Sequence, residues 1–211
     1  MAQSTFRWSV WVPIIAVVII GVGVGVGLNM HRGPKVTYPD ITSPRPVDGN
    51  PSAKVVVQEY SDFQCPACGA AYQMVKDLVA QYHDSIRFEY KQFPLSQIHV
   101  NAYNAALASE CANDQGKFWP YHDKLFENQS KIGSSDLKQY ATDLGLDTAK
   151  FNACLDTRAK KKVVDADIQA GNALNVPGTP TFFVNGVMTD ANGISSAIKN
   201  AVNGAVQGPV K

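Results

Sequence analysis

The chain has 211 residues, which is enough for one domain of ordinary size together with additional segments. Its formal net charge is +1, so the composition indicates neither a nucleic-acid-binding surface nor a strongly charged partner. The hydrophobic content of 45% is normal for a globular domain once the N-terminal segment is counted separately.

Residues 10–28 carry no charged side chain and are almost entirely apolar. A helix of this length spans roughly 28 Å, close to the hydrocarbon thickness of a bilayer. We therefore expect a transmembrane anchor at 10–28, preceded by a cytoplasmic N-terminus at 1–9. A cleaved signal peptide is the alternative. Its apolar core is normally about 7–15 residues long, and Gly25-Val26-Gly27 is a poor match to the small-x-small cleavage pattern.

The flanking charges leave the orientation of this anchor open. Arg7 precedes the span, whereas Arg32 and Lys35 follow it, which taken alone slightly favours a cytoplasmic domain. Four cysteines, however, favour an oxidising compartment. We therefore expect a single-pass protein of the cell membrane with its catalytic domain on the extracytoplasmic side.

Residues 29–52 are predicted to form a linker, because they are rich in proline and glycine. Such a composition favours a semi-extended chain without a packed core. The prolines of this segment are Pro34, Pro39, Pro44, Pro46 and Pro51.

Strand and helix patterns then alternate along the chain. The β-branched run 54–60 predicts a buried strand, and the apolar spacing over 68–79 predicts an amphipathic helix. A second strand is expected at 86–93, ended by Pro94. Near the C-terminus, 181–184 is a third strand, and the Asn185-Gly186 sequence that follows it predicts a hairpin.

Between about residues 97 and 174 the sequence contains only helix patterns. One helix is expected to begin at Ser134 or Ser135 and another after Asp147, because these side chains favour N-cap positions. A third helix is expected from 164 to 174, with Asp165 and Asp167 on its polar side. Residues 194–202 predict a last amphipathic helix after the hairpin.

Cys65 and Cys68 lie where the first strand gives way to the first helix. A cysteine at a helix N-terminus is favoured as a thiolate by unpaired N–H groups and the helix dipole. Half of a zinc site is one alternative, but zinc usually needs a second pair or nearby histidines. A structural crosslink is another, but so small a ring stabilises little. We therefore interpret the pair as redox-active, with Cys65 exposed and attacking and Cys68 its buried partner.

Three segments resemble the DsbA-like thiol-disulfide oxidoreductases of the thioredoxin superfamily. The run 59–68 (EYSDFQCPAC) is similar to their active-site segment, and the match extends to 116–119 (GKFW) and 178–186 (GTPTFFVNG). The resemblance implies an α/β fold, with a thioredoxin-like core over 53–208 and an inserted helical subdomain at about 97–174.

The same resemblance implies roles for three further residues. Glu59 corresponds to the family's buried glutamate, which relays a proton to or from the inner cysteine; the alternative is an exposed glutamate at an edge. Pro180 corresponds to the family's cis-proline, and Thr179 before it would pair with an extended substrate chain.

Cys111 and Cys154 are interpreted as a structural disulfide within the helical insertion. The loop between them is long, and in the chain-entropy model closing it contributes roughly 4 kcal/mol. A second redox relay is the alternative, although neither cysteine has a second cysteine at CxxC spacing.

The leading hypothesis is therefore an anchored oxidase that donates its disulfide to reduced exported polypeptides. The resemblance implies reoxidation by a membrane quinone-linked partner, DsbB-like or VKOR-like. We expect no cofactor; the cysteine and histidine spacing argues against a metal, and the net charge argues against nucleic acid. The most oxidising members carry histidine where this chain has Ala67, and valine where it has Thr179. A disulfide isomerase or reductase therefore stays open, as does a peptide-binding chaperone with a vestigial CxxC.

Overall fold

The structure, a computed structural model, describes residues 45–207. The expected N-terminus at 1–9, the expected anchor at 10–28 and most of the expected linker therefore lie outside the described residues. Within 45–207, no helix is both long enough and apolar enough to cross a membrane.

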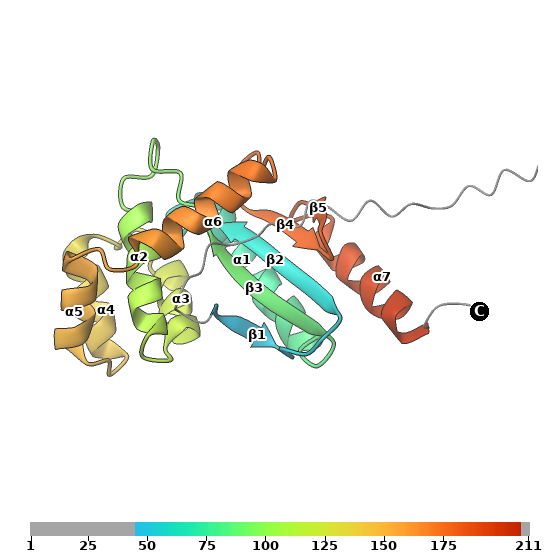
Figure 1. Cartoon of the computed structure of the whole chain (residues 1–211), viewed down its shortest axis with the longest axis horizontal. Helices are drawn as coiled ribbons and strands as arrows, with labels where there is room; N and C mark the ends of the chain where they lie inside the picture. Colours follow the sequence, from blue (N-terminus) through green and yellow to red (C-terminus); the bar gives the residue numbers. More distant parts are fainter. Residues whose placement is uncertain (1–44, 208–211) are drawn as a thin grey trace, which may run out of the picture. The chain divides into compact units, whose positions relative to one another are not determined.

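A mixed β-sheet forms the centre of the described part of the chain (Figure 1). Over residues 45–207 it has five strands in the order β1-β3-β2-β4-β5. Strands β2 and β3 are parallel, and every other neighbouring pair is antiparallel. The strands are β1 (Val47–Gly49), β2 (Val55–Ser61), β3 (Ile86–Gln92), β4 (Thr181–Val184) and β5 (Val187–Thr189).

Helices cover both faces of the sheet. Helices α1 (Pro66–Gln81) and α7 (Ile194–Gln207) pack on one face, over a core that includes Val57 and Phe88. Helix α6 (Lys161–Ala173) crosses the other face, where Tyr60 of β2 packs with β4 and the end of α6 (Figure 1). Since successive residues of β2 point to opposite faces, Glu59 lies on the α1 side of the sheet.

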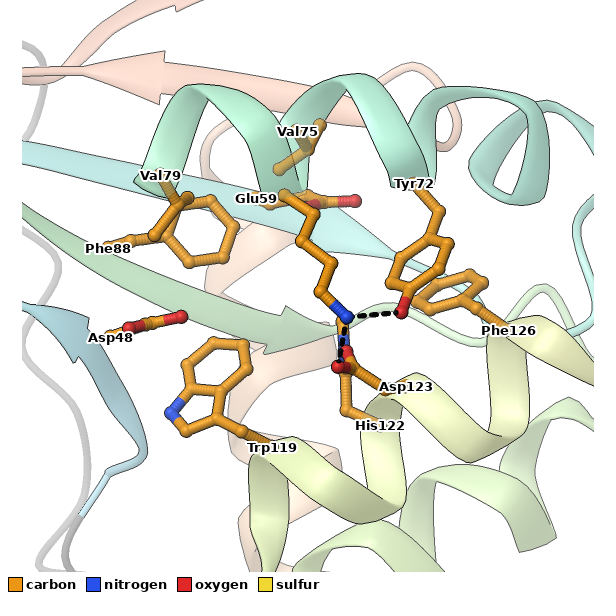
Figure 2. Close-up of a pocket in the computed structure, with 11 residues that line it drawn as sticks. Asp48, Glu59, Tyr72, Val75, Val79, Phe88, Trp119, His122, Asp123 and Phe126 are labelled. Carbon is orange, nitrogen blue, oxygen red and sulfur yellow. Dashed lines mark hydrogen bonds and ion pairs between the residues drawn. The ribbon is translucent and has the colours of Figure 1, made fainter. Parts of the chain in front are cut away.

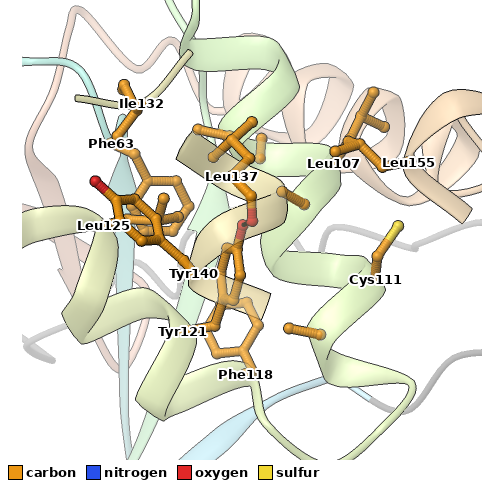
Figure 3. Packing of buried hydrophobic residues seen from close by; sticks show 14 of the residues in the cluster. Phe63, Leu107, Cys111, Phe118, Tyr121, Leu125, Ile132, Leu137, Tyr140 and Leu155 are labelled. Atoms are coloured by element: carbon orange, nitrogen blue, oxygen red, sulfur yellow. Dashed lines mark hydrogen bonds between the residues drawn. The ribbon is translucent and has the colours of Figure 1, made fainter. Parts of the chain in front are cut away.

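The expected helical insertion lies between β3 and β4. Its helices are α2 (Ala102–Asn113), α3 (Phe118–Glu127), α4 (Ser134–Asp143), α5 (Thr148–Asp156) and α6. They enclose a core of their own that includes Tyr121, Leu125 and Leu137, each fully buried (Figure 3). The same core continues to Phe63, so the insertion shares one packed interior with the loop that joins β2 to α1.

Two sequence predictions in the helical and hairpin regions are confirmed. Asp147 is the N-cap of α5, where its carboxylate accepts a hydrogen bond from the Lys150 N–H (3.1 Å). Asn185 and Gly186 connect β4 to β5 with positive φ angles of 49° and 82°, the conformation that a tight hairpin turn requires.

Two predictions about boundaries are wrong. Val47–Gly49 is an edge strand paired with β3, so the linker expected over 29–52 ends earlier; the Trp119 indole also donates to Val47 O (3.0 Å). Helix α4 is capped by Gly133, whose N–H is bound by the Asp136 carboxylate (3.0 Å), and not by either serine.

The expectation that Asp167 is on a polar helix face is also wrong. Its side chain is fully buried and forms an ion pair with Arg45, which lies 122 residues earlier. A second guanidinium nitrogen of Arg45 lies 3.9 Å from the buried Glu110 carboxylate. A buried carboxylate is tolerated where an opposite charge accompanies it, and the sequence pattern of α6 does not reveal a partner so distant.

Candidate active site

Cys65 and Cys68 occupy the start of α1. Cys65 is the N-cap residue with φ −72° and ψ 122°, and Pro66 follows at the first helical position, where its missing N–H costs nothing. Cys68 lies in the first turn and is fully buried, as expected. Cys65 is only 7% exposed, so the prediction that its sulfur is exposed is wrong. The segment before β4 covers it.

That covering segment contains a cis peptide bond between Thr179 and Pro180. In the thiol form Cys65 Sγ donates to Thr179 O, at 3.4 Å. The Thr179 hydroxyl is buried without a hydrogen-bond partner. Thr179 therefore presents both an acceptor for the thiol and a hydroxyl donor suited to a thiolate, directly against the first cysteine.

The pKa values of the two cysteines are moved in opposite directions. A hydrogen bond from Cys68 is the largest effect on Cys65; together with Thr179 and the N–H groups of Cys68 and Ala67 it outweighs burial and lowers the pKa of Cys65 to about 5. Burial, followed by the hydrogen bond to Cys65, raises the pKa of Cys68 well above its ordinary value. At neutral pH the reduced site therefore holds one thiolate at Cys65 and one thiol at Cys68.

Glu59 lies close enough to act on the inner cysteine. It is 4% exposed, and its burial raises the pKa of its carboxyl group to about 7. Its charge in turn contributes to the raised pKa of Cys68 and to that of the buried Tyr90 beside it in the sheet. The Ser61 hydroxyl opposes the pKa shifts of both Glu59 and Cys68, although it has no hydrogen bond of normal geometry.

A cavity of about 60 Å³ connects this carboxyl group with the surface between α1 and α3 (Figure 2). Its lining includes Glu59, Tyr72, Trp119 and His122, together with the ion pair of Lys76 and Asp123 (2.6 Å). The side chains of that ion pair are 48% and 30% exposed, so they form the solvent end. The volume is enough for one or more water molecules between these side chains.

Buried polar side chains also hold the loop ahead of Cys65. The Asp62 carboxylate, 1% exposed, accepts hydrogen bonds from the N–H groups of Gln64 (2.7 Å) and Leu95 (2.8 Å) and pairs with His99 Nδ1 (2.8 Å). Gln64 Oε1 accepts from the Asn101 N–H (2.7 Å). The sequence patterns did not identify this network, because most of its contacts join residues more than thirty positions apart.

The other sequence-predicted site residues are placed as follows. Cys111 and Cys154 are joined in a disulfide between α2 and α5, whereas Cys65 and Cys68 are free thiols. Among residues 45–207, no group of three or more His, Cys, Asp or Glu side chains is arranged to hold a metal ion.

The family model described as thioredoxin matches residues 42–203 of this chain. A curated relative, the Na(+)/H(+) antiporter NhaA 3 of Salinispora tropica, is 41% identical over 140 residues, which cover 66% of this chain and 21% of the antiporter. The chain thus spans about a fifth of the length of that relative.

Solved structures show the same fold. The oxidised BdbD of Bacillus subtilis superposes with a TM-score of 0.68 at 25% identity, covering 76% of this chain and 94% of that one. A thioredoxin-like oxidoreductase of Silicibacter pomeroyi superposes with a TM-score of 0.64 at 27% identity, covering 76% of this chain and 93% of that one.

Proposed function

This chain belongs to the thioredoxin family and is similar in fold to DsbA-like thiol-disulfide oxidoreductases, and from this premise we propose that it donates a Cys65–Cys68 disulfide to exported polypeptides. One observation carries the proposal. Cys65 is held at a helix N-terminus with Cys68 and Thr179 beside its sulfur, and its pKa is lowered to about 5.

The proposed transfer takes two steps. A substrate thiolate attacks Cys65 Sγ, a substrate–Cys65 bond forms, and the Cys65–Cys68 bond breaks with Cys68 leaving as a thiolate. Protonated Glu59 then supplies the proton that Cys68 requires. A second substrate thiolate attacks the substrate sulfur and releases the Cys65 thiolate. The substrate loses two electrons and the CxxC gains them.

The lowered pKa of Cys65 favours this direction. A stabilised thiolate stabilises the reduced protein, and each unit of pKa depression is about 1.4 kcal/mol, or roughly 30 mV for a two-electron couple. A stable thiolate is also the better leaving group in the second step. The disulfide form is therefore the reactive, oxidising form.

A reductase or isomerase is the second candidate, and Glu59 is the observation that favours it. A carboxyl group with a pKa of about 7 is suited to removing a proton from Cys68 near neutral pH. Cys68 would then attack a mixed disulfide at Cys65 and release a reduced substrate. The same site supports both directions, and the reduction potential decides between them.

The setting of the reaction is part of the proposal. We expect the domain to act on the extracytoplasmic side of the cell membrane, held there by residues 10–28. Reoxidation of the CxxC by a membrane quinone-linked partner, DsbB-like or VKOR-like, completes the cycle.

The proposal is tested by equilibrating the protein with glutathione buffers and by assaying the oxidation of a reduced, unfolded test protein. An oxidase has a CxxC potential well above the glutathione couple and oxidises the test protein stoichiometrically. A potential below that couple assigns the reductase. The Cys68→Ala variant should accumulate a mixed disulfide with substrate. Peptide binding without any mixed disulfide would instead indicate a chaperone with a vestigial CxxC.

A further inference from the structure

Gln129 connects the helical insertion to the first catalytic cysteine. It lies between α3 and α4, and its side-chain Nε2 donates one hydrogen bond to Phe63 O (2.9 Å) and one to Cys65 O (3.0 Å). A single amide group therefore uses both of its N–H groups on the active-site loop. Phe63 and Cys65 are themselves nearly fully buried, at 1% and 7% exposed.

Gly69 makes room for this contact. A Cβ atom at Gly69 would lie 1.9 Å from Gln129 Oε1, which is closer than any side chain tolerates. Glycine inside a helix costs about 1 kcal/mol relative to alanine, and the Gly69 backbone is ordinary right-handed helix. The absence of a side chain at this position is therefore explained by the approach of Gln129.

One of the two hydrogen bonds of Gln129 ends at the Cys65 carbonyl, where the hydrogen bonds of α1 begin. Cys65 O accepts both from Gln129 and from the Gly69 N–H (3.1 Å), the first turn of the helix. The Cys65 side chain makes no capping hydrogen bond, so the hydrogen bonds at its carbonyl hold the backbone at the N-terminus of α1. The sulfur of the same residue lies 3.4 Å from Thr179 O and close to the N–H groups of Ala67 and Cys68.

We propose that Gln129 is a positioning residue through which the helical insertion holds Cys65 against α1 and Thr179, and so sets the dithiol–disulfide equilibrium of the site. This rests on the proposed function, since it concerns the same sulfur pair. The side chains of Asp62 and Gln64 make hydrogen bonds that hold the loop before Cys65, whereas Gln129 makes a hydrogen bond to Cys65 itself.

The test compares two glutamines of the insertion. Gln115, like Gln129, makes two side-chain hydrogen bonds to backbone: its Nε2 donates to Asp147 O (3.2 Å), and its Oε1 accepts from the Asp147 N–H (2.7 Å). Both contacts lie within the insertion and involve neither Cys65, Cys68 nor the loop before them. Gln129→Ala and Gln115→Ala therefore each remove one amide side chain with two hydrogen bonds to backbone, and only Gln129→Ala removes them from the loop that joins β2 to α1.

Gln129→Ala should shift the equilibrium constant with glutathione about tenfold toward the disulfide form, equivalent to roughly 30 mV. The pH midpoint for Cys65 ionisation should rise by about one unit, measured by thiolate absorbance. Gly69→Ala should have the same effect, because its Cβ displaces Gln129. Gln129→Asn keeps an amide but shortens the side chain, and should behave like the alanine variant. Gln115→Ala should change neither quantity.

A second matched control addresses helix propensity. Gly204 lies in α7, and no atom outside its own helix turn lies within 4 Å of the position that an added methyl group would take. Gly204→Ala therefore adds the same group as Gly69→Ala without a clash. It should leave the equilibrium constant unchanged.

The proposal would be overturned if wild type, Gln129→Ala and Gly69→Ala had the same equilibrium constant with glutathione. Gln129 would then be a structural contact without influence on the cysteines. Equal shifts in Gln129→Ala and Gln115→Ala would overturn it as well, because a general loss of stability would then account for both. Failure of the wild type to oxidise a test protein would sink the proposed function alone, because the glutathione equilibrium of the CxxC is measured without any protein substrate.

Discussion

The two cysteine pairs of this protein contain the same atoms and differ in what surrounds them. Cys65 and Cys68 lie at the N-terminus of α1, beside Thr179 and a buried carboxyl group. Cys111 and Cys154 join two helices of the insertion, 43 residues apart, within or against its apolar core. The comparison predicts that reactivity depends on hydrogen-bond donors at one sulfur and on a carboxyl group near the other. We therefore expect Cys111 and Cys154 to act as a crosslink.

The largest effect is expected for Cys65→Ser. Disulfide transfer to a reduced test protein should be lost, because no other free sulfur lies at a helix N-terminus in the described chain. The double variant Cys111→Ala/Cys154→Ala is the matched control and should keep transferring disulfides. Wild-type transfer rates in Cys65→Ser, or loss of transfer in the control, would contradict the assignment of disulfide transfer to the Cys65–Cys68 pair.

The second effect is on stability. Removing the Cys111–Cys154 crosslink should lower the free energy of unfolding by roughly 4 kcal/mol, because the unfolded chain regains the freedom of a long loop. Urea unfolding of the double alanine variant measures this. During titration with a reductant, thiol labelling should detect Cys65 and Cys68 before Cys111 and Cys154. Simultaneous opening of both pairs would favour the redox-relay interpretation of the second pair.

The third effect concerns Glu59. Its pKa is raised from 4.5 to about 7 in the folded protein. Its contribution to the free energy of unfolding is therefore fully present below pH 4.5, where the group is protonated in both states, and is lost as the pH rises through 7. At about pH 4, the Glu59→Gln variant should have a free energy of unfolding similar to that of the wild type. At about pH 8, it should be more stable than the wild type by roughly 3 kcal/mol.

The same variant should slow disulfide transfer by roughly 10- to 100-fold, since glutamine cannot supply a proton to Cys68. Stopped-flow measurement from about pH 6 to 8 tests this, because that range spans the Glu59 titration. A pH-independent stability difference together with an unchanged rate would mean that Glu59 takes no part in proton transfer.

The smallest effect is expected for Ser61→Ala. The hydroxyl group lies near both Glu59 and Cys68 and lowers the pKa of each, so its removal should raise both values. The transfer rate should change by less than about tenfold. Because the hydroxyl is buried without a partner, stability should be unchanged or slightly higher. A loss of several kcal/mol would show that Ser61 makes a contact essential to the fold.

Local patterns were enough to predict much of this molecule. The β-branched run predicted β2, the apolar spacing over 68–79 predicted α1, and the Asn185-Gly186 sequence predicted the hairpin. Each of these features depends on neighbours in the sequence, where spacing and propensity carry the information.

Contacts between distant segments could not be predicted in the same way. Strand β1 has no distinctive composition and exists because β3 pairs with it. The sequence pattern places Asp167 on a polar helix surface, and only the folded structure shows that it is buried with Arg45. Gln129 reaches Cys65 across 64 positions, and no spacing rule signals such a contact. The near-burial of Cys65 likewise depends on a segment more than a hundred residues later.

The Arg45 ion pairs have a mechanical consequence. Arg45 is the first described residue, and its side chain, 15% exposed, is bound to carboxylates on α6 and α2. A pulling force on the chain ahead of it would load these buried charges before it reached the hydrogen bonds between β1 and β3. Separating a buried ion pair is costly, typically about 3–5 kcal/mol when one partner is lost. Arg45 therefore ties the residue ahead of β1 to two helices of the insertion, independently of the hydrogen bonds that hold the edge strand.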